Sequence, residues 1–325
     1  MAMLISGLLD RGEIMLDKNK TMVKRCFLTG EYVFYATDRA KRPHSYKKYC
    51  DVKVTPKEFC PFCPQNSYMT PEPIYYDNVI KIIPNKYPFV HTNEETYGVH
   101  DVVIDTQNHD EKLVDFSDDH LFKLMKVMQK RFNDLQNDNG SKYVQIFKNS
   151  GMDAGASQSH SHWQIASLPV VPLKMEHLLN VLKEYYEKNS KCYFCSIDFG
   201  SRIVVENQSF VSYLPADGKF PYGMDLLPKR HISSLSEFTD RELKDFGIIL
   251  RDSVKRLVTL RPEISYNVCL YSCPPDINCK DYFHFYAQII PRIGHMAGFE
   301  FSTGCYINSV LPENGAEELR NIIKD

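Results

Sequence analysis

The residues best suited to chemistry lie together in residues 149–164, which read Asn-Ser-Gly-Met-Asp-Ala-Gly-Ala-Ser-Gln-Ser-His-Ser-His-Trp-Gln. Here His160, His162 and Gln164 occupy every second position, a spacing that puts three side chains on one face of a strand. The glycines before them predict a loop whose backbone N–H groups can bind phosphate. An ordinary turn before a half-exposed strand would give the same pattern, so the prediction needs partners elsewhere in the chain.

Two Cys-x-x-Cys pairs provide such partners, because each is followed by a histidine ahead of a predicted helix and by another on a later predicted strand. The two sets are Cys60, Cys63, His109 and His160, then Cys192, Cys195, His231 and His284. One pair alone would also fit a redox site or chance. Two thiolates and two imidazoles, however, form a closed tetrahedral Zn²⁺ site. The repeated order predicts two zinc sites, of which the first has the more regular surroundings.

The two halves differ at the residue that follows each late histidine by two positions. The first half has His162 two residues after His160, whereas the second has Tyr286 two residues after His284. In addition, residues 274–278, Pro-Pro-Asp-Ile-Asn, replace the glycine loop. We infer that only the first half kept a reactive imidazole, which makes His162 the candidate nucleophile.

Hydrophobic periodicity predicts the elements that position these residues. Strands are expected at 79–83, 99–105, 143–147, 266–271 and 283–291, and two more within 23–36. Helices are expected after an N-cap at Ser117, over 173–189, and after Thr239, where Glu242 completes a capping box. The sequence thus predicts an α+β fold with a pseudo-twofold internal repeat. Its two histidine-triad-like halves, 1–189 and 190–325, would each have antiparallel sheets with helices packed on one face.

Composition excludes several classes of protein. The 325 residues carry a net charge of −2 and are 43% hydrophobic, which predicts a large core and no basic surface for nucleic acid. No apolar run approaches the roughly 18 residues of a membrane span, and residues 1–15 lack the basic start of a signal peptide. The ten cysteines then indicate a reducing compartment, with thiols or metal ligands in preference to disulfides. We expect a cytoplasmic protein.

These motifs together resemble galactose-1-phosphate uridylyltransferase and the related ADP-glucose phosphorylase type of nucleotidyltransferase, within the histidine triad superfamily. The resemblance rests on Cys-Pro-Phe-Cys at 60–63 and on Asn-x-Gly-x-x-x-Gly-x-Ser-x-x-His-x-His-x-Gln at 149–164. It extends over nearly the whole chain, through Arg-Ala-Lys-Arg-Pro at 39–43, Pro-Asn-Lys-Tyr-Pro at 84–88, and a C-terminal segment from 298 to 308.

The resemblance implies roles for individual residues. His162 would become covalently nucleotidylated, Gln164 would hydrogen-bond the phosphoryl oxygens, and both Cys/His sets would hold zinc. Arginines and loop N–H groups also suit phosphate on chemical grounds. The predicted substrate-binding residues are Arg39, Arg42, Asn85, Asn149, Gly151, Gly155 and Ser157. The chain departs from the family pattern at Gln65, Ser161, Tyr286 and Tyr306, and the last two departures leave the acceptor open.

Three functional hypotheses follow. The first is a nucleotidyltransferase that acts on a UDP- or ADP-sugar and on a sugar phosphate or phosphate, alone or as a homodimer. Its ping-pong cycle would pass through nucleotidyl-His162. The second is a hydrolase or phosphorylase of dinucleoside polyphosphates, which uses the same intermediate. The third is a zinc-binding scaffold without catalysis. Replacing His162 would abolish turnover under the first two and leave the third unchanged.

Overall fold

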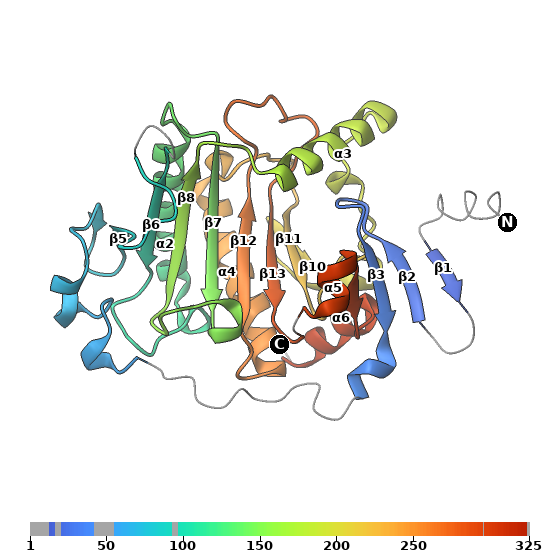
Figure 1. Ribbon diagram of the computed structural model, residues 1–325, viewed down its shortest axis with the longest axis horizontal. Coiled ribbons are helices and arrows are strands. Elements are labelled where there is room, and N and C mark those ends of the chain that lie inside the picture. Colours follow the sequence, from blue (N-terminus) through green and yellow to red (C-terminus); the bar gives the residue numbers. More distant parts are fainter. Residues whose placement is uncertain (1–12, 17–20, 42–54, 93–96, 295, 324–325) are drawn as a thin grey trace.

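The computed structural model describes residues 13–16, 21–41, 55–92, 97–294 and 296–323, which form an α+β protein (Figure 1). Its strands are β1 (Glu13–Leu16), β2 (Thr21–Arg25), β3 (Tyr32–Ala36), β4 (Tyr75–Tyr76), β5 (Lys81–Pro84), β6 (Val99–Ile104), β7 (Tyr143–Ser150), β8 (His162–Leu168), β9 (Ile203–Glu206), β10 (Phe210–Tyr213), β11 (Met224–Pro228), β12 (Tyr266–Tyr271), β13 (Tyr286–Pro291) and β14 (Tyr306–Asn308). Its helices are α2 (Asp118–Gln136), α3 (Leu173–Asn189), α4 (Asp240–Leu260), α5 (Gly298–Thr303) and α6 (Pro312–Asn321). In these ranges no helix has both the length and the apolar character to cross a membrane.

One antiparallel sheet of ten strands runs through both predicted halves, in the order β4-β5-β6-β8-β7-β12-β13-β11-β10-β9. The halves join where β7 pairs with β12. From either edge towards this join, the first three strands follow one another in chain order and the next two are exchanged. The orders are β4-β5-β6-β8-β7 in the first half and β9-β10-β11-β13-β12 in the second. This is the order that two related halves would give. The predicted α+β class with antiparallel sheets is confirmed, although the halves share one sheet.

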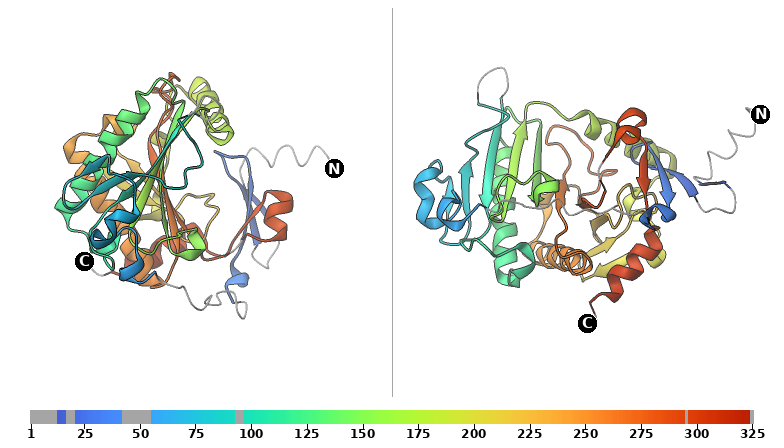
Figure 2. Two further views of the ribbon diagram at one scale, coloured as in Figure 1. Left: turned by 60° about the vertical axis from the view of Figure 1, so that its left-hand side comes forward. Right: turned by 60° about the horizontal axis from the view of Figure 1, so that its bottom comes forward.

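The long helices α2 and α4 cover one face of this sheet, and α3 covers the other (Figure 2). Side chains alternate along β7 accordingly, so that Val144 and Ile146 join the core beneath α2 and α4 while Tyr143 faces α3. The prediction of helices on one face therefore holds for α2 and α4 but not for α3. The two long helices approach closely at Gly247, where a Cβ would lie 2.9 Å from the Cβ of Leu121.

The first strands of the chain lie beside the second half, although the predicted boundary assigns them to the first. Strands β1, β2, β3 and β14 form a smaller sheet, in which β3 and β14 pair in parallel. The backbone N–H of Phe27 donates to Asp217 at 2.8 Å, and the Tyr35 hydroxyl donates to the Gly218 carbonyl at 3.0 Å. Figure 1 shows this sheet at the end of the molecule where β10 and β13 lie.

Local sequence signals explain where the long helices begin. The Ser117 hydroxyl accepts from the backbone N–H of His120 at 3.2 Å, as expected of an N-cap. At the start of α4, the Thr239 hydroxyl accepts from the N–H of Glu242 at 3.3 Å, and the Glu242 carboxylate accepts from the N–H of Thr239 at 2.9 Å. Both predicted caps are confirmed.

Candidate active site and metal-binding groups

The loop between β7 and β8 presents the predicted phosphate-handling segment. Gly151 and Gly155 have φ values of 84° and 80°, in the left-handed region that favours glycine. A Cβ at Gly151 would also lie 2.2 Å from the Ser265 hydroxyl oxygen, so only glycine fits there. The side-chain amide of Asn267 on β12 donates to Asn149 at 2.8 Å and to the Ala154 carbonyl at 2.9 Å. The neighbouring strand β12 therefore holds the loop in place.

Four predicted metal ligands of the first half converge in the interior. Cys60, Cys63, His109 and His160 are at most 4% exposed, and their ligand atoms lie within 4.8 Å of one another. The Cys63 sulfur lies 3.3 Å from Nδ1 of His109, and Nδ1 of His160 lies 3.6 Å from both sulfurs. A tetrahedral Zn²⁺ would place sulfur and nitrogen ligands about 3.6 Å apart, given the usual bond lengths. The donor set and its spacing thus fit a metal ion.

Further contacts hold these ligands in position. Nε2 of His160 lies 2.9 Å from the Thr106 carbonyl, so the ring presents Nδ1 to the two sulfurs. The buried amide of Asn66, which the sequence did not single out, donates to the Cys60 carbonyl at 2.9 Å. Burial, together with the neighbouring Cys60, raises the pKa of the Cys63 thiol to about 11. A bound cation would reverse this shift by stabilising the thiolates.

His162 is the first residue of β8 and is 5% exposed. Its Nδ1 lies 2.8 Å from the His160 carbonyl oxygen. Because a carbonyl only accepts, the neutral ring carries its proton on Nδ1 and keeps a lone pair on Nε2. Burial, and then the charge of Lys148, lowers the pKa of His162 to about 4, so the imidazole is neutral at pH 7. The ring of Phe62 lies 5.2 Å from that of His162 and 6.1 Å from that of His160, between centroids.

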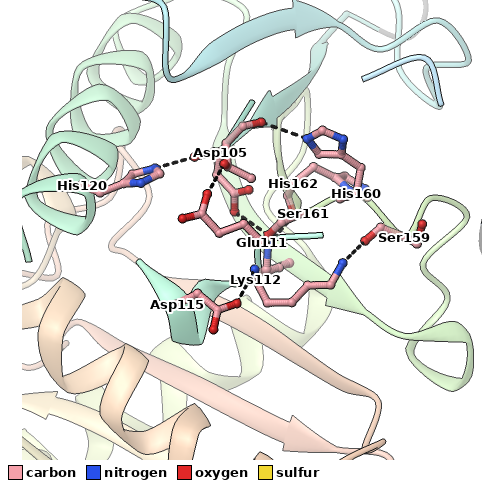
Figure 3. A network of polar contacts seen from close by, with 11 residues as sticks. Asp105, Glu111, Lys112, Asp115, His120, Ser159, His160, Ser161 and His162 are labelled. Carbon is pink, nitrogen blue, oxygen red and sulfur yellow. Dashed lines mark hydrogen bonds and ion pairs between the residues drawn. The ribbon is translucent and has the colours of Figure 1, made fainter. Parts of the chain in front are cut away.

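A buried ion pair lies behind this histidine, and the sequence did not reveal it. The Lys148 ammonium on β7 donates to Asp105 at 2.9 Å, to the Ser161 hydroxyl at 2.8 Å and to the His162 carbonyl at 3.0 Å. The Ser161 hydroxyl also donates to Asp105 at 3.0 Å. Figure 3 shows His120 of α2 directed at Asp105, whose carbonyl lies 2.6 Å from Nε2 of His120. The backbone around His162 is thus held by charge-assisted hydrogen bonds.

Gln164 extends the site towards β6 and the segment after β5. Its side-chain oxygen lies 2.9 Å from Nε2 of His100, and the Asn85 amide lies 3.2 Å from the same nitrogen. One ring nitrogen serves only one of these partners at a time. The predicted residues Asn85 and Gln164 therefore meet through His100, which the sequence analysis did not name. A histidine near the start of a predicted strand, with no motif around it, did not indicate this role.

The two arginines predicted to bind the substrate, Arg39 and Arg42, are not found beside His162 among the described residues. Arg39 is exposed and lies directly after β3, a strand of the smaller sheet. In Figure 1, β12 and β13 lie between this sheet and β8. This chain therefore does not bring Arg39 to His162. Arg42 lies outside the described residues. Of the remaining predicted contacts, Ser157 is exposed on the loop that precedes β8, and Asn149 is partly buried near the end of β7.

The second Cys/His set is less complete than the first. The ligand atoms of Cys192, Cys195 and His231 lie within 4.8 Å of one another, and the group does not include His284. Nδ1 of His284 lies 2.8 Å from the Phe285 carbonyl, although its ring centroid is 5.1 Å from that of His231. Cys195 is exposed, in contrast to both cysteines of the first group.

One pair among the other cysteines differs from the sequence prediction. Cys273 and Cys279 form a disulfide across the turn at 274–278, with Cα atoms 6.4 Å apart. The expectation of thiols in place of disulfides is therefore wrong for this pair. The turn brings the two Cβ atoms together, and residue spacing alone did not reveal this.

Comparisons with known proteins find two enzymes that are similar to nearly the whole chain. ADP-glucose phosphorylase of Arabidopsis thaliana is 31% identical over 91% of this chain and 91% of its own length. Galactose-1-phosphate uridylyltransferase of Thermotoga maritima is 30% identical over 90% of this chain and 96% of its own. The crystal structure of the Arabidopsis enzyme with bound ADP-glucose superposes with a TM-score of 0.84, at 29% identity, over 94% of this chain and 100% of the other. A profile described as "Domain of unknown function (DUF4931) N-terminal domain" matches residues 42–171.

Proposed function

The chain belongs to the family of galactose-1-phosphate uridylyltransferase and ADP-glucose phosphorylase, and from this premise we propose its reaction. It transfers the nucleotidyl group of a nucleoside diphosphate-sugar to a phosphate or sugar phosphate, through a covalent intermediate on His162. The observation that carries this proposal is the buried imidazole of His162, which is neutral and keeps its Nε2 lone pair because Nδ1 is held by the His160 carbonyl.

The proposed cycle has two displacements at the same phosphorus. In the first, Nε2 of His162 attacks the α-phosphorus, a P–N bond forms, and the bond from phosphorus to the bridging oxygen breaks. The electron pair of that bond leaves with the sugar 1-phosphate. In the second, an oxygen of the acceptor phosphate attacks, the P–N bond breaks, and its electron pair returns to Nε2. The ring ends the cycle in its starting state.

The surroundings of His162 support both steps. The loop at 151–157 offers backbone N–H groups to the negative phosphoryl oxygens, and the Gln164 amide lies two residues along β8 on the same face. The Lys148 ammonium lies against the His162 carbonyl at 3.0 Å, and its charge opposes protonation of the ring. A neutral nucleophile is therefore available across the physiological pH range.

The proposed role of zinc at Cys60, Cys63, His109 and His160 is structural. Four protein ligands leave no open position for water or substrate. A metal at this group would fix His160, whose carbonyl in turn orients the His162 ring. The three residues Cys192, Cys195 and His231 would form a second, more accessible site.

Intact-protein mass spectrometry tests the intermediate. The protein is exposed briefly to an equal mixture of UDP-glucose and ADP-glucose, alongside His162→Ala and, as a matched control in the second half, Tyr286→Phe. We expect one nucleotidyl adduct per chain in the wild type and in Tyr286→Phe, and none in His162→Ala. The mass of the adduct identifies the base, and chasing it with phosphate or a sugar phosphate identifies the acceptor.

Three results would refute the proposal. An adduct that persists in His162→Ala would place the nucleophile elsewhere. Absence of any adduct from either donor, together with full turnover of a dinucleoside polyphosphate by hydrolysis, would favour the hydrolase hypothesis. Absence of both activities in a folded, metal-loaded protein would favour the non-catalytic scaffold.

A further inference from the structure

The second half has a cavity at the position that corresponds to the candidate active site. Strand pairing aligns Gln164, Phe147, Cys269 and Gln288 in one row across β8, β7, β12 and β13. Paired residues of an antiparallel sheet project to the same face, so Gln164 and Gln288 lie on one face, three strand spacings or about 14 Å apart. By the same register, Tyr286 stands where the first half has His162.

The cavity measures about 290 Å³, and its lining includes Tyr271, Tyr286 and Gln288. Its other walls come from α3, from the segment before β11 and from the smaller sheet. The volume is close to the lower end of the range for small-molecule pockets and suits a ligand with one or two rings. None of the lining residues belongs to the Cys/His groups or to the surroundings of His162.

A buried carboxyl group lies in the cavity wall beside this glutamine. Asp225 of β11 is 5% exposed, and the Gln288 amide donates to its Oδ1 at 3.0 Å. Within the described part of the chain no other group donates to this carboxyl, so its second oxygen remains available to a ligand. Burial raises the pKa of Asp225 to about 7. The first half has Val102 at this place in the row, paired with Gln164, so the carboxyl is specific to the second half.

The remaining lining is aromatic and carries balanced charge. Tyr271 and Tyr286 stack with centroids 4.5 Å apart and an angle of 11° between their planes. Two lysines and two aspartates line the cavity: Lys174, Lys219, Asp217 and Asp225. Lys219 is further paired with Glu31 of the turn between β2 and β3. Because neither sign dominates, the cavity favours an uncharged ligand over a phosphate ester or a cation.

We propose that this cavity is a second ligand site, which binds an uncharged saturated ring with neighbouring hydroxyl groups. The free oxygen of Asp225 and the remaining donor and acceptor of the Gln288 amide hydrogen-bond the hydroxyls, while the tyrosines contact the apolar faces of the ring. A monosaccharide and the ribose of a nucleoside share this chemistry. The site does not require nucleotidyl transfer at His162, and it binds its ligand without reaction.

Saturation-transfer NMR titrations of the full-length protein with glucose, adenosine and glucose 1-phosphate test this site. Gln288→Ala and Gln164→Ala form a matched pair, because the two glutamines occupy equivalent places in the row. We expect saturable binding of glucose or adenosine that weakens about tenfold in Gln288→Ala and in Asp225→Asn, the effect of losing one hydrogen bond to a buried polar group. Gln164→Ala should bind as the wild type does.

The probe that binds decides whether the ligand is a monosaccharide or a nucleoside. Binding of glucose alone indicates a monosaccharide, and binding of adenosine alone indicates a nucleoside. The inference is overturned if neither probe binds the folded protein, or if Gln164→Ala loses binding that Gln288→Ala keeps. Glucose 1-phosphate binding at this site more than tenfold tighter than glucose would overturn the assignment of an uncharged ligand. Adduct formation at His162 should be unchanged in Gln288→Ala, so the two proposals fail independently.

Discussion

Replacing Lys148 by methionine tests how the candidate site is held together. The side chains of Lys148 and Asp105 are 3% and 0% exposed, and their charges meet at 2.9 Å. Methionine keeps most of the apolar stem and removes the ammonium group. Asp105 would then keep only the Ser161 hydroxyl as a side-chain donor, and its Oδ1 already has no hydrogen-bond partner among the described residues. The mutation therefore leaves a buried charge without compensation.

The expected magnitude follows from these contacts. Removing one partner of a buried ion pair destabilises a protein by about 3–5 kcal/mol. In the double mutant Lys148→Met/Asp105→Leu no charge remains, but Ser161 and the His162 carbonyl still lose the ammonium donor, at about 1 kcal/mol for each hydrogen bond. We therefore expect about 4 kcal/mol for Lys148→Met and about 2 kcal/mol for the double mutant.

Urea unfolding followed by circular dichroism measures these differences. Lys142→Met is the matched control, because Lys142 pairs with Asp276 at 2.6 Å on the surface, with side-chain exposures of 47% and 61%. Such an exposed pair contributes about 1 kcal/mol or less. The reasoning is refuted if Lys148→Met costs no more than Lys142→Met, or if the double mutant is less stable than Lys148→Met. Adduct formation in Lys148→Met should also slow, since the His162 backbone loses its anchor.

Two further predictions concern ionisation and metal. Burial raises the pKa of Asp225 from 3.8 to about 7. Between these values the folded chain keeps a proton that the unfolded chain releases. The contribution of this proton to stability is complete below about pH 4 and is lost as the pH rises through 7. Between pH 4 and pH 8, the free energy of unfolding of Asp225→Asn, measured with urea, should therefore rise relative to that of the wild type by up to about 4 kcal/mol. A fall relative to the wild type would contradict this. Dialysis against a chelator, followed by elemental analysis, should remove metal from Cys192, Cys195 and His231 before the buried first group, and Cys60→Ser should lower the melting temperature more than Cys195→Ser. Equal loss from both groups would contradict the difference in burial and ligand number.

The parts of the fold that sequence predicts are those decided by local chemistry. The bounds of α3 are those expected from periodicity, and the Thr239/Glu242 capping box lies within four residues of chain. The convergence of Cys60 with His160 spans a hundred residues, yet ligand type and repeated spacing indicated it. Such signals persist because zinc ligands belong to few residue types and recur in fixed patterns.

The parts that sequence missed depend on contacts with no local signal. A lysine within an alternating strand is typical of an exposed position, and Lys148 is buried only because Asp105 lies 43 residues away on the chain but beside it in space. The parallel pairing of β3 with β14 joins the two ends of the chain, and neither strand alone indicates its partner. Likewise, His284 matched His160 in sequence, but its Nδ1 contacts the Phe285 carbonyl in place of a cysteine.

That last difference bears on why only the first half would be reactive. In the first half, the His160 ring faces the cysteines and its carbonyl holds Nδ1 of His162, the proposed nucleophile. In the second, Tyr286 occupies the equivalent place, and burial raises the pKa of its phenol, so it stays protonated at neutral pH. Replacing Tyr286 by histidine would not by itself restore the geometry, because His284 is oriented differently and Asp225 fills the adjacent place in the row. The shared register therefore fixes the position of both sites, while the side chains give the first site the proposed nucleophile and the second the proposed binding groups.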